Sequence, residues 1–201
     1  MRGVGISPER QGQHLETYQV MKRLFRTTAV DFTFEEGSIV EGAFEAIHVP
    51  GHCSGQVCLR LGDVLLSADH VLAGISPHLS PEQITPWTGV GHYFESLRKI
   101  ERLEGLRLGL GGHKGPIEDL RGRIAEIRRL HEQRHAEILA LCTEPRTIAE
   151  LSREVFGKVR THHVLLALLE TGAQLEYLDT RGDLVPAEPG ENEPVVRWVR
   201  P

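Results

Sequence analysis

Three short apolar strands in this sequence each run into a segment that carries a histidine or an aspartate. The segments are His48–Gln56 (HVPGHCSGQ), Leu65–His70 (LLSADH) and Gly111–Ile117 (GGHKGPI). A side chain at a strand end is held by a rigid sheet while its head group projects into a loop-lined cleft, as a metal site requires. Imidazole and carboxylate groups bind Zn²⁺, Mn²⁺ or iron ions. The sequence therefore predicts metal-binding side chains at the strand ends of a sheet.

Each of these residues also has an ordinary structural explanation. A single histidine at a strand end is more often hydrogen-bonded within the structure than bound to a metal. An aspartate that closes a strand more often caps a turn. The combination of three such ends in one chain is what favours a metal site.

Composition narrows the class of protein. The 201 residues carry 23 Lys+Arg and 28 Asp+Glu, a formal net charge of −5. This acidic balance argues against a broad nucleic-acid-binding surface, and no apolar run is long enough to cross a bilayer. The three cysteines have no disulfide-like spacing, which fits a reducing compartment. We expect a cytoplasmic protein with no membrane segment. Its eleven histidines are a high number for 201 residues and point to metal or acid/base chemistry.

The apolar pattern predicts a mixed α+β chain whose character changes after Pro116. Val57–Leu61 and Val64–Ala68 have the pattern of buried strands joined by a tight Gly-Asp turn. Leu120–Leu141 is one long helical run with charged residues at helical spacing.

The C-terminal part has the pattern of a winged helix. Thr147, followed by Glu150, has the signature of a capping box that starts a second helix. A third helix is predicted from Thr161 to Glu170, ended by Gly172, and then a β-hairpin from Gln174 to Val185. We place a first domain at residues 1–118, a winged-helix-like domain at 119–186, and a tail at 187–201 with one strand-like patch.

The segments PGHCSGQ, LLSADH and GGHKGPI, in this order and spacing, resemble the later metal motifs of the metallo-β-lactamase superfamily. The branch that the chain resembles most is the glyoxalase-II-like, β-lactamase-like protein 2 type, whose members carry an appended winged-helix-like domain. The resemblance covers about residues 35–185. It implies an α+β fold: a partial metallo-β-lactamase αββα sandwich followed by a helical winged-helix-like C-terminal domain.

The resemblance implies a role for three residues. His52 would bind the first metal ion, Asp69 would bridge both ions, and His113 would bind the second. The implied reaction is hydrolysis of a thioester, ester or phosphodiester by a metal-activated water. The implied cofactor is a pair of zinc ions, although Mn or Fe also suits such ligands. Further candidates for contact with the substrate, or for support of the ligands, are His70, His78 and Lys114.

The chain departs from the family pattern at its most important motif. The HxHxDH sequence that supplies the remaining ligands occurs nowhere in the 201 residues, so no catalytic residue is assigned and enzyme activity stays open. We expect the chain to begin after that motif. It is then a truncated hydrolase, weak or inactive alone, or a protein whose site a homodimer partner or a complementing N-terminal chain completes. A third alternative is a misassigned start that omits the true N-terminus.

Two readings from other classes remain. In the first, the chain is a non-catalytic subunit that docks through its exposed sheet. In the second, its winged helix contacts nucleic acid. The predicted third helix carries no Lys or Arg after Arg160, which argues against sequence-specific DNA binding. The expected substrates are a small molecule or RNA.

Overall fold

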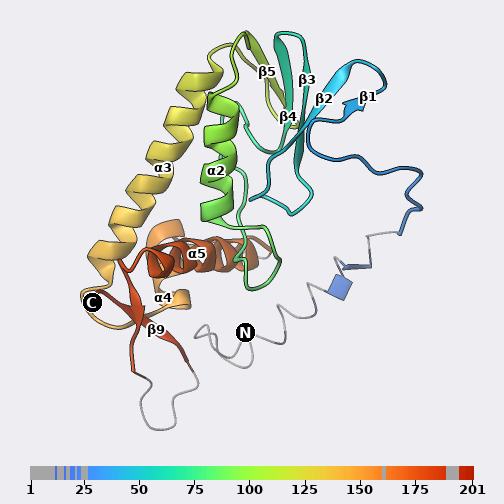
Figure 1. Cartoon of the computed structure of the whole chain (residues 1–201). Helices are drawn as coiled ribbons and strands as arrows, with labels where there is room; N and C mark the ends of the chain where they lie inside the picture. The colour runs from blue at the N-terminus through green and yellow to red at the C-terminus, as the bar shows by residue number, and fades with distance from the viewer. Residues whose placement is uncertain are drawn as a thin grey trace. The chain divides into compact units, whose positions relative to one another are not determined.

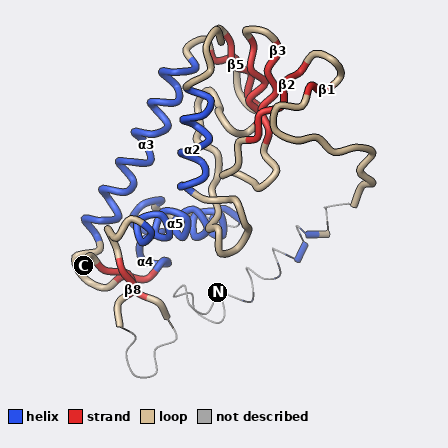
Figure 2. The backbone as a smooth tube through the Cα atoms, in the orientation of Figure 1, coloured by secondary structure: helices blue, strands red, loops and turns tan. Residues whose placement is uncertain are grey.

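The computed structural model of the chain describes residues 12, 16, 19–20, 22–23, 27–159, 162–188 and 195–201. It has a six-stranded sheet, a three-stranded sheet and the helices α2 to α5 (Figures 1 and 2). One compact unit spans Phe32–Gln133, and Arg134–Pro201 belongs to a second. The mixed α+β class predicted from the sequence is confirmed.

The first unit is built on the six-stranded sheet, whose strands lie side by side in chain order. All neighbours are antiparallel except β4 and β5, which are parallel. Strands β2, β4 and β5 therefore run in one direction and end at the same edge of the sheet. The six strands are β1 (Ile39–Val40), β2 (Phe44–His48), β3 (Val57–Leu61), β4 (Val64–Ala68), β5 (Leu108–Gly111) and β6 (Pro116–Ile117).

One face of this sheet is buried beneath helices. Cys58 and Leu65 on that face are fully buried. A Cβ built at Gly109, beside Leu65, would lie 3.0 Å from the side chain of Leu120, so the absence of a side chain lets α3 pack closely. Figure 1 shows α2 (Val90–Glu101) and α3 (Leu120–Leu141) on one side of the sheet.

The opposite face of the sheet keeps apolar side chains partly exposed. Leu59 pairs with Leu66, and Leu66 with Leu110, so these three share that face. Leu59 and Leu66 are half-buried, while Leu110 and the neighbouring Leu61 are 37% and 45% exposed. The two strands predicted as buried at 57–61 and 64–68 are thus present, but only one of their faces is fully buried.

The second unit combines a short helix and a longer one with a small sheet. Thr147 caps α4 through the predicted capping box: its hydroxyl accepts from Glu150 N–H, and the Glu150 carboxylate accepts from Thr147 N–H. The small sheet has the order β7-β9-β8, all antiparallel. The elements are β7 (Arg146–Thr147), α4 (Ile148–Phe156), α5 (His162–Thr180), β8 (Val185–Pro186) and β9 (Arg197–Val199).

The predicted hairpin at 174–185 is wrong, because the third helix does not end at Gly172. Helix α5 continues to Thr180. A glycine inside a helix costs about 1 kcal/mol, and the residues on both sides of Gly172 are buried, so burial outweighs that cost. The helix ends instead before Gly182, whose positive φ of 76° suits the turn that follows. The small sheet recruits β9 from the segment predicted as a tail.

The core of the second unit is apolar and has buried polar groups beside it. It consists of Ile138, Cys142, Leu151, Leu175, Leu178 and Leu184. Beside it, Arg134 pairs with the buried Glu170 at 3.0 Å, and the ring of His135 stacks on Tyr177 with centroids 5.1 Å apart. Burial lowers the pKa of His135 to about 4.

None of the helices in the described part of the chain is long and apolar enough to cross a membrane.

The neutral state of His135 makes the second unit sensitive to acid. Its pKa in the folded state lies below the ordinary value of 6.5, so the unfolded chain takes up the proton first. Stability is therefore lost as the pH falls from 6.5 to about 4, at a slope of about 1.4 kcal/mol per pH unit for this one proton. We expect His135→Gln to be less stable at pH 7 but to lose less stability on acidification.

The measurement is the urea midpoint between about pH 7 and about pH 4.5, followed by the fluorescence of Trp198 in a Trp87→Phe background. His163 on α5 is exposed, so His163→Gln is the matched control. Its urea midpoint should change with pH as that of the parent does. Equal acid sensitivity of His135→Gln and the parent would contradict the assignment.

Candidate metal centre

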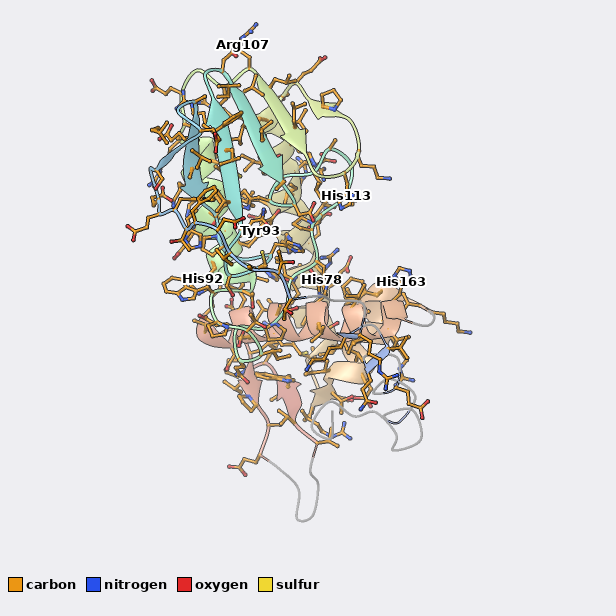
Figure 3. All side chains as sticks on the ribbon, turned by 90° about the vertical axis from the view of Figure 1, so that its right-hand side faces the viewer. His78, His92, Tyr93, Arg107, His113 and His163 are labelled. Carbon is orange, nitrogen blue, oxygen red and sulfur yellow. The ribbon has the colours of Figure 1, made fainter. Side chains whose placement is uncertain are left out.

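The structure brings His52, Asp69 and His113 together at one edge of the large sheet. They follow β2, β4 and β5, the three strands that run in one direction. Figure 3 shows His113 at one end of the sheet and Arg107, which precedes β5, at the other. The carboxylate of Asp69 lies between the two imidazoles: Oδ2 is 3.9 Å from His52 Nε2, and Oδ1 is 3.5 Å from His113 Nε2.

The orientation of His52 is fixed from behind. Its Nδ1 lies 2.6 Å from the backbone carbonyl of His78. A carbonyl only accepts, so Nδ1 carries a proton, and in the tautomer that this hydrogen bond selects Nε2 presents a lone pair to Asp69. Two acceptors then face each other at a distance too long for a hydrogen bond, an arrangement that a cation between them would satisfy. A ligating histidine held through its other nitrogen is the usual pattern of metal sites.

Asp69 is placed by an irregular strand end. The pairing of β4 with β5 shifts register between Leu66 and Ala68, and Ala68 has a positive φ of 43°. The N–H of Gly112 donates to the carbonyl of Ala68 at 2.7 Å. A Cβ at Gly112 would lie 2.6 Å from Asp69 Oδ1. The second glycine of GGHKGPI is therefore required by the close approach of the Asp69 carboxylate.

His52 follows a turn that only glycine fits. Gly51 has a φ of 132°, and a Cβ there would lie 2.5 Å from the Cα of Tyr93 at the start of α2. Its carbonyl accepts from the N–H of Gly89 at 3.0 Å, and Ser54 Oγ donates to the carbonyl of Pro86 at 2.6 Å. The end of the loop after β4 is thereby fastened alongside the histidine segment.

The residues fit a metal centre in part. Asp69 and the two histidines provide one imidazole and one carboxylate oxygen at each of two positions, whereas a catalytic zinc ion usually has three protein ligands. No group of three or more His, Cys, Asp and Glu side chains in the described residues is arranged to hold one ion. The side chains of His52, Asp69 and His113 are 27%, 35% and 63% exposed, so ions can reach them.

The other candidate residues differ in their surroundings. His70 is fully buried with its ring against Tyr93, and burial lowers its pKa to about 3, so it lies behind the ligands as a neutral group. His78 contributes its backbone carbonyl, while its ring lies 3.3 Å from Ser80 Oγ. Lys114 stands on the exposed turn after β5 with a φ of 71°.

Sequence reasoning missed the residues that support the site from the helices. The sequence predicts charged residues at helical spacing along the long helix. In the structure, however, its Arg123 is only 8% exposed and its His131 is fully buried. Tyr93 of α2 is also fully buried. Periodicity could have marked these positions as inward-facing, but no signal in the sequence connects them to the loop after Asp69.

Comparison with known proteins identifies the family. The family model described as the metallo-beta-lactamase superfamily matches residues 3–113. The chain belongs to this superfamily.

Relatives of known sequence or structure agree with this assignment. Lactamase-like protein nscB of Aspergillus fumigatus is 29% identical over 179 residues, which cover 78% of this chain and 52% of that protein. The chain thus spans about half the length of the curated relatives that it matches. A metallo-beta-lactamase family protein from Thermus thermophilus has a TM-score of 0.73 at 29% identity, covering 86% of this chain and 55% of its own. A beta-lactamase domain protein from Burkholderia ambifaria has a TM-score of 0.86 at 26% identity, covering 100% and 60%.

The glycine beside the carboxylate provides a direct test of the site geometry. We expect Gly112→Ala to turn the Asp69 carboxylate away from His113, because the added methyl group would overlap its Oδ1. Since that oxygen ends a side chain that can rotate, the loss of stability should stay small, about 1 kcal/mol. Gly115→Ala is the matched control, because nothing lies within 4 Å of a Cβ there.

The carboxyl ¹³C resonance of Asp69 and a crystal structure of each variant report the orientation. An Asp69 resonance and rotamer unchanged in Gly112→Ala would show that the carboxylate does not pack against this glycine.

Proposed function

We propose that this chain supplies part of a two-ion metal centre and that the protein is a metal-dependent hydrolase. The observation that carries the proposal is the position of the Asp69 carboxylate, with one oxygen toward each of two imidazole nitrogens. A carboxylate placed in this way suits a ligand shared by two cations. Membership of the metallo-beta-lactamase superfamily, whose members typically bind divalent metals, supports the same reading.

In this proposal His52 and Asp69 would hold one ion, and Asp69 and His113 would hold the other. When bound, divalent cations would supply the Lewis acidity that acidifies water and polarises the substrate. The chain's own contribution is orientation: the His78 carbonyl keeps the proton of His52 on Nδ1, so that Nε2 is ready to bind. Zinc is the proposed metal, and Mn or Fe would also accept this ligand chemistry.

The proposed substrate is a thioester, ester or phosphodiester, in a small molecule or in RNA. The support is the resemblance of the three strand-end motifs to the glyoxalase-II-like branch. We also propose that the second unit is the winged-helix-like domain of that branch. Its order of elements, β7-α4-α5-β8-β9, with the three strands in one sheet, supports this.

The proposal requires further ligands beyond these three residues. Each position has one imidazole and one carboxylate oxygen, fewer than the three protein ligands of a catalytic zinc ion. We propose that the remaining ligands come from outside these 201 residues, in a further segment of the protein, a second copy or a complementing chain, and that these residues alone are weak or inactive. The partly exposed apolar face around Leu61 and Leu110 supports a partner, because such a face favours association.

The same face supports a second candidate function, that of a non-catalytic subunit. In that case the chain would associate through its sheet and bind no metal at the strand ends. Solution mass together with metal content separates the two functions: association without metal favours the subunit, and association with metal favours the hydrolase.

The test is zinc per chain after dialysis against dilute zinc, for the parent and for single-ligand variants. We expect about two ions per chain in the completed protein and about one in His52→Ala or His113→Ala. Asp69→Asn should lose more than either, because its carboxylate faces both positions. His92→Ala, which removes a histidine paired with Glu82 at 2.9 Å, is the control and should leave zinc unchanged.

Hydrolysis of a thioester and of a phosphodiester is measured on the same samples. If His52→Ala and Asp69→Asn retain the zinc content and activity of the parent, the metal centre lies elsewhere and the proposal is refuted.

A further inference from the structure

One segment of chain connects the two halves of the candidate metal centre. It runs from Asp69 to His78, here called the connecting segment. At its first residue it presents the carboxylate, and at its last it presents the carbonyl that accepts from His52 Nδ1 at 2.6 Å. The path of its backbone therefore sets both the position of Asp69 and the tautomer of His52.

Buried donors hold this segment along its length. The hydroxyl of Tyr93 donates to the carbonyl of His70 at 2.9 Å, and Ser67 Oγ donates to the carbonyl of Val71 at 2.8 Å. Further along, Ser76 Oγ lies 3.2 Å from the Nε2 of His131, a fully buried residue of α3.

Arg123 of α3 makes the widest attachment. Its Nε donates to the carbonyl of Leu72 at 2.6 Å, and its Nη2 donates to the carbonyl of Ile75 at 2.8 Å. Its charge is balanced by Glu126, whose Oε2 lies 2.5 Å from Nη1. The side chain is 8% exposed, so these partners replace the water that the guanidinium would otherwise need. One planar group thus fixes two carbonyls three residues apart.

Lysine has neither the length nor the geometry to repeat this attachment. Its ammonium is a point charge that can reach one carbonyl well, whereas the guanidinium presents several N–H groups in a rigid plane. Loss of Arg123 would leave the Leu72 and Ile75 carbonyls without these donors.

We propose that Arg123 is a positioning residue for the metal centre, acting through the connecting segment on Asp69 and His52. The part of this inference that concerns metal affinity rests on the proposed function, whereas the part that concerns the His52 tautomer does not. Helix α3 supplies none of the three candidate ligands, yet through Arg123 it controls how two of them are presented.

The experiment compares Arg123→Lys and Arg123→Met with the parent in the full chain. The matched controls are Arg128→Lys and Arg128→Met, since Arg128 lies on the same helix and pairs with Glu101 at 3.1 Å. The first readout is the tautomer of His52 in metal-free protein, from long-range ¹H–¹⁵N spectra assigned with His52→Gln. The second is the dissociation constant for zinc, and thermal unfolding of the metal-free variants measures any general loss of stability.

We expect Nδ1-protonated His52 in the parent and in the Arg128 variants, and a mixture of tautomers in both Arg123 variants. Zinc affinity should fall by about 10- to 100-fold on loss of such supporting contacts, more in Arg123→Met than in Arg123→Lys. If Arg123→Met does not fold, Arg123→Lys decides the question.

An Arg123→Lys protein with the parent tautomer and zinc affinity within about two-fold of the parent would overturn the inference. A completed protein that binds no zinc would instead refute the proposed function, and the tautomer of His52 would still decide the role of Arg123.

Discussion

The position of the Asp69 carboxylate, with an imidazole nitrogen facing each of its oxygens, is the constraint shared by the strand ends of the first unit. The parallel pairing of β4 and β5 brings Asp69 and His113 to the same edge. The bare backbone of Gly112 leaves room for the carboxylate. Behind it, the connecting segment carries the orientation of Asp69 to His52 through one carbonyl. The sheet brings the strand ends to one edge, and residues of the helices α2 and α3 hold the connecting segment in place.

The same geometry underlies the proposal that these three residues form only part of a metal site. One imidazole faces each oxygen of the carboxylate, so in the proposed centre the ligands divide between two positions. The two faces of the large sheet also differ. One face is buried under α2 and α3, whereas Leu61 and Leu110 on the other face are partly exposed. In the proposed function, a second layer of polypeptide over that face would cover these side chains and supply the remaining ligands.

The sequence predicted the strand ends well, because each candidate ligand follows an apolar strand, and His52 and His113 each come directly after a glycine. Helix Leu120–Leu141 and the cap at Thr147 were also predictable from local periodicity and capping chemistry. The predicted end of the third helix at Gly172 was wrong, because burial of the residues beside Gly172 outweighs its low helix propensity. Arg123 was beyond prediction: its partners are backbone carbonyls about 50 positions away, and such contacts leave no pattern in the side chains.

The most direct test of the central claim is anomalous diffraction at the zinc edge from crystals of the zinc-loaded protein. The account predicts two zinc peaks, one on each side of the Asp69 carboxylate, each about 2.0–2.2 Å from one oxygen. One peak should lie beside His52 Nε2 and the other beside His113 Nε2. Zinc bound elsewhere, with the Asp69 oxygens and both imidazoles making no metal contact, would contradict it.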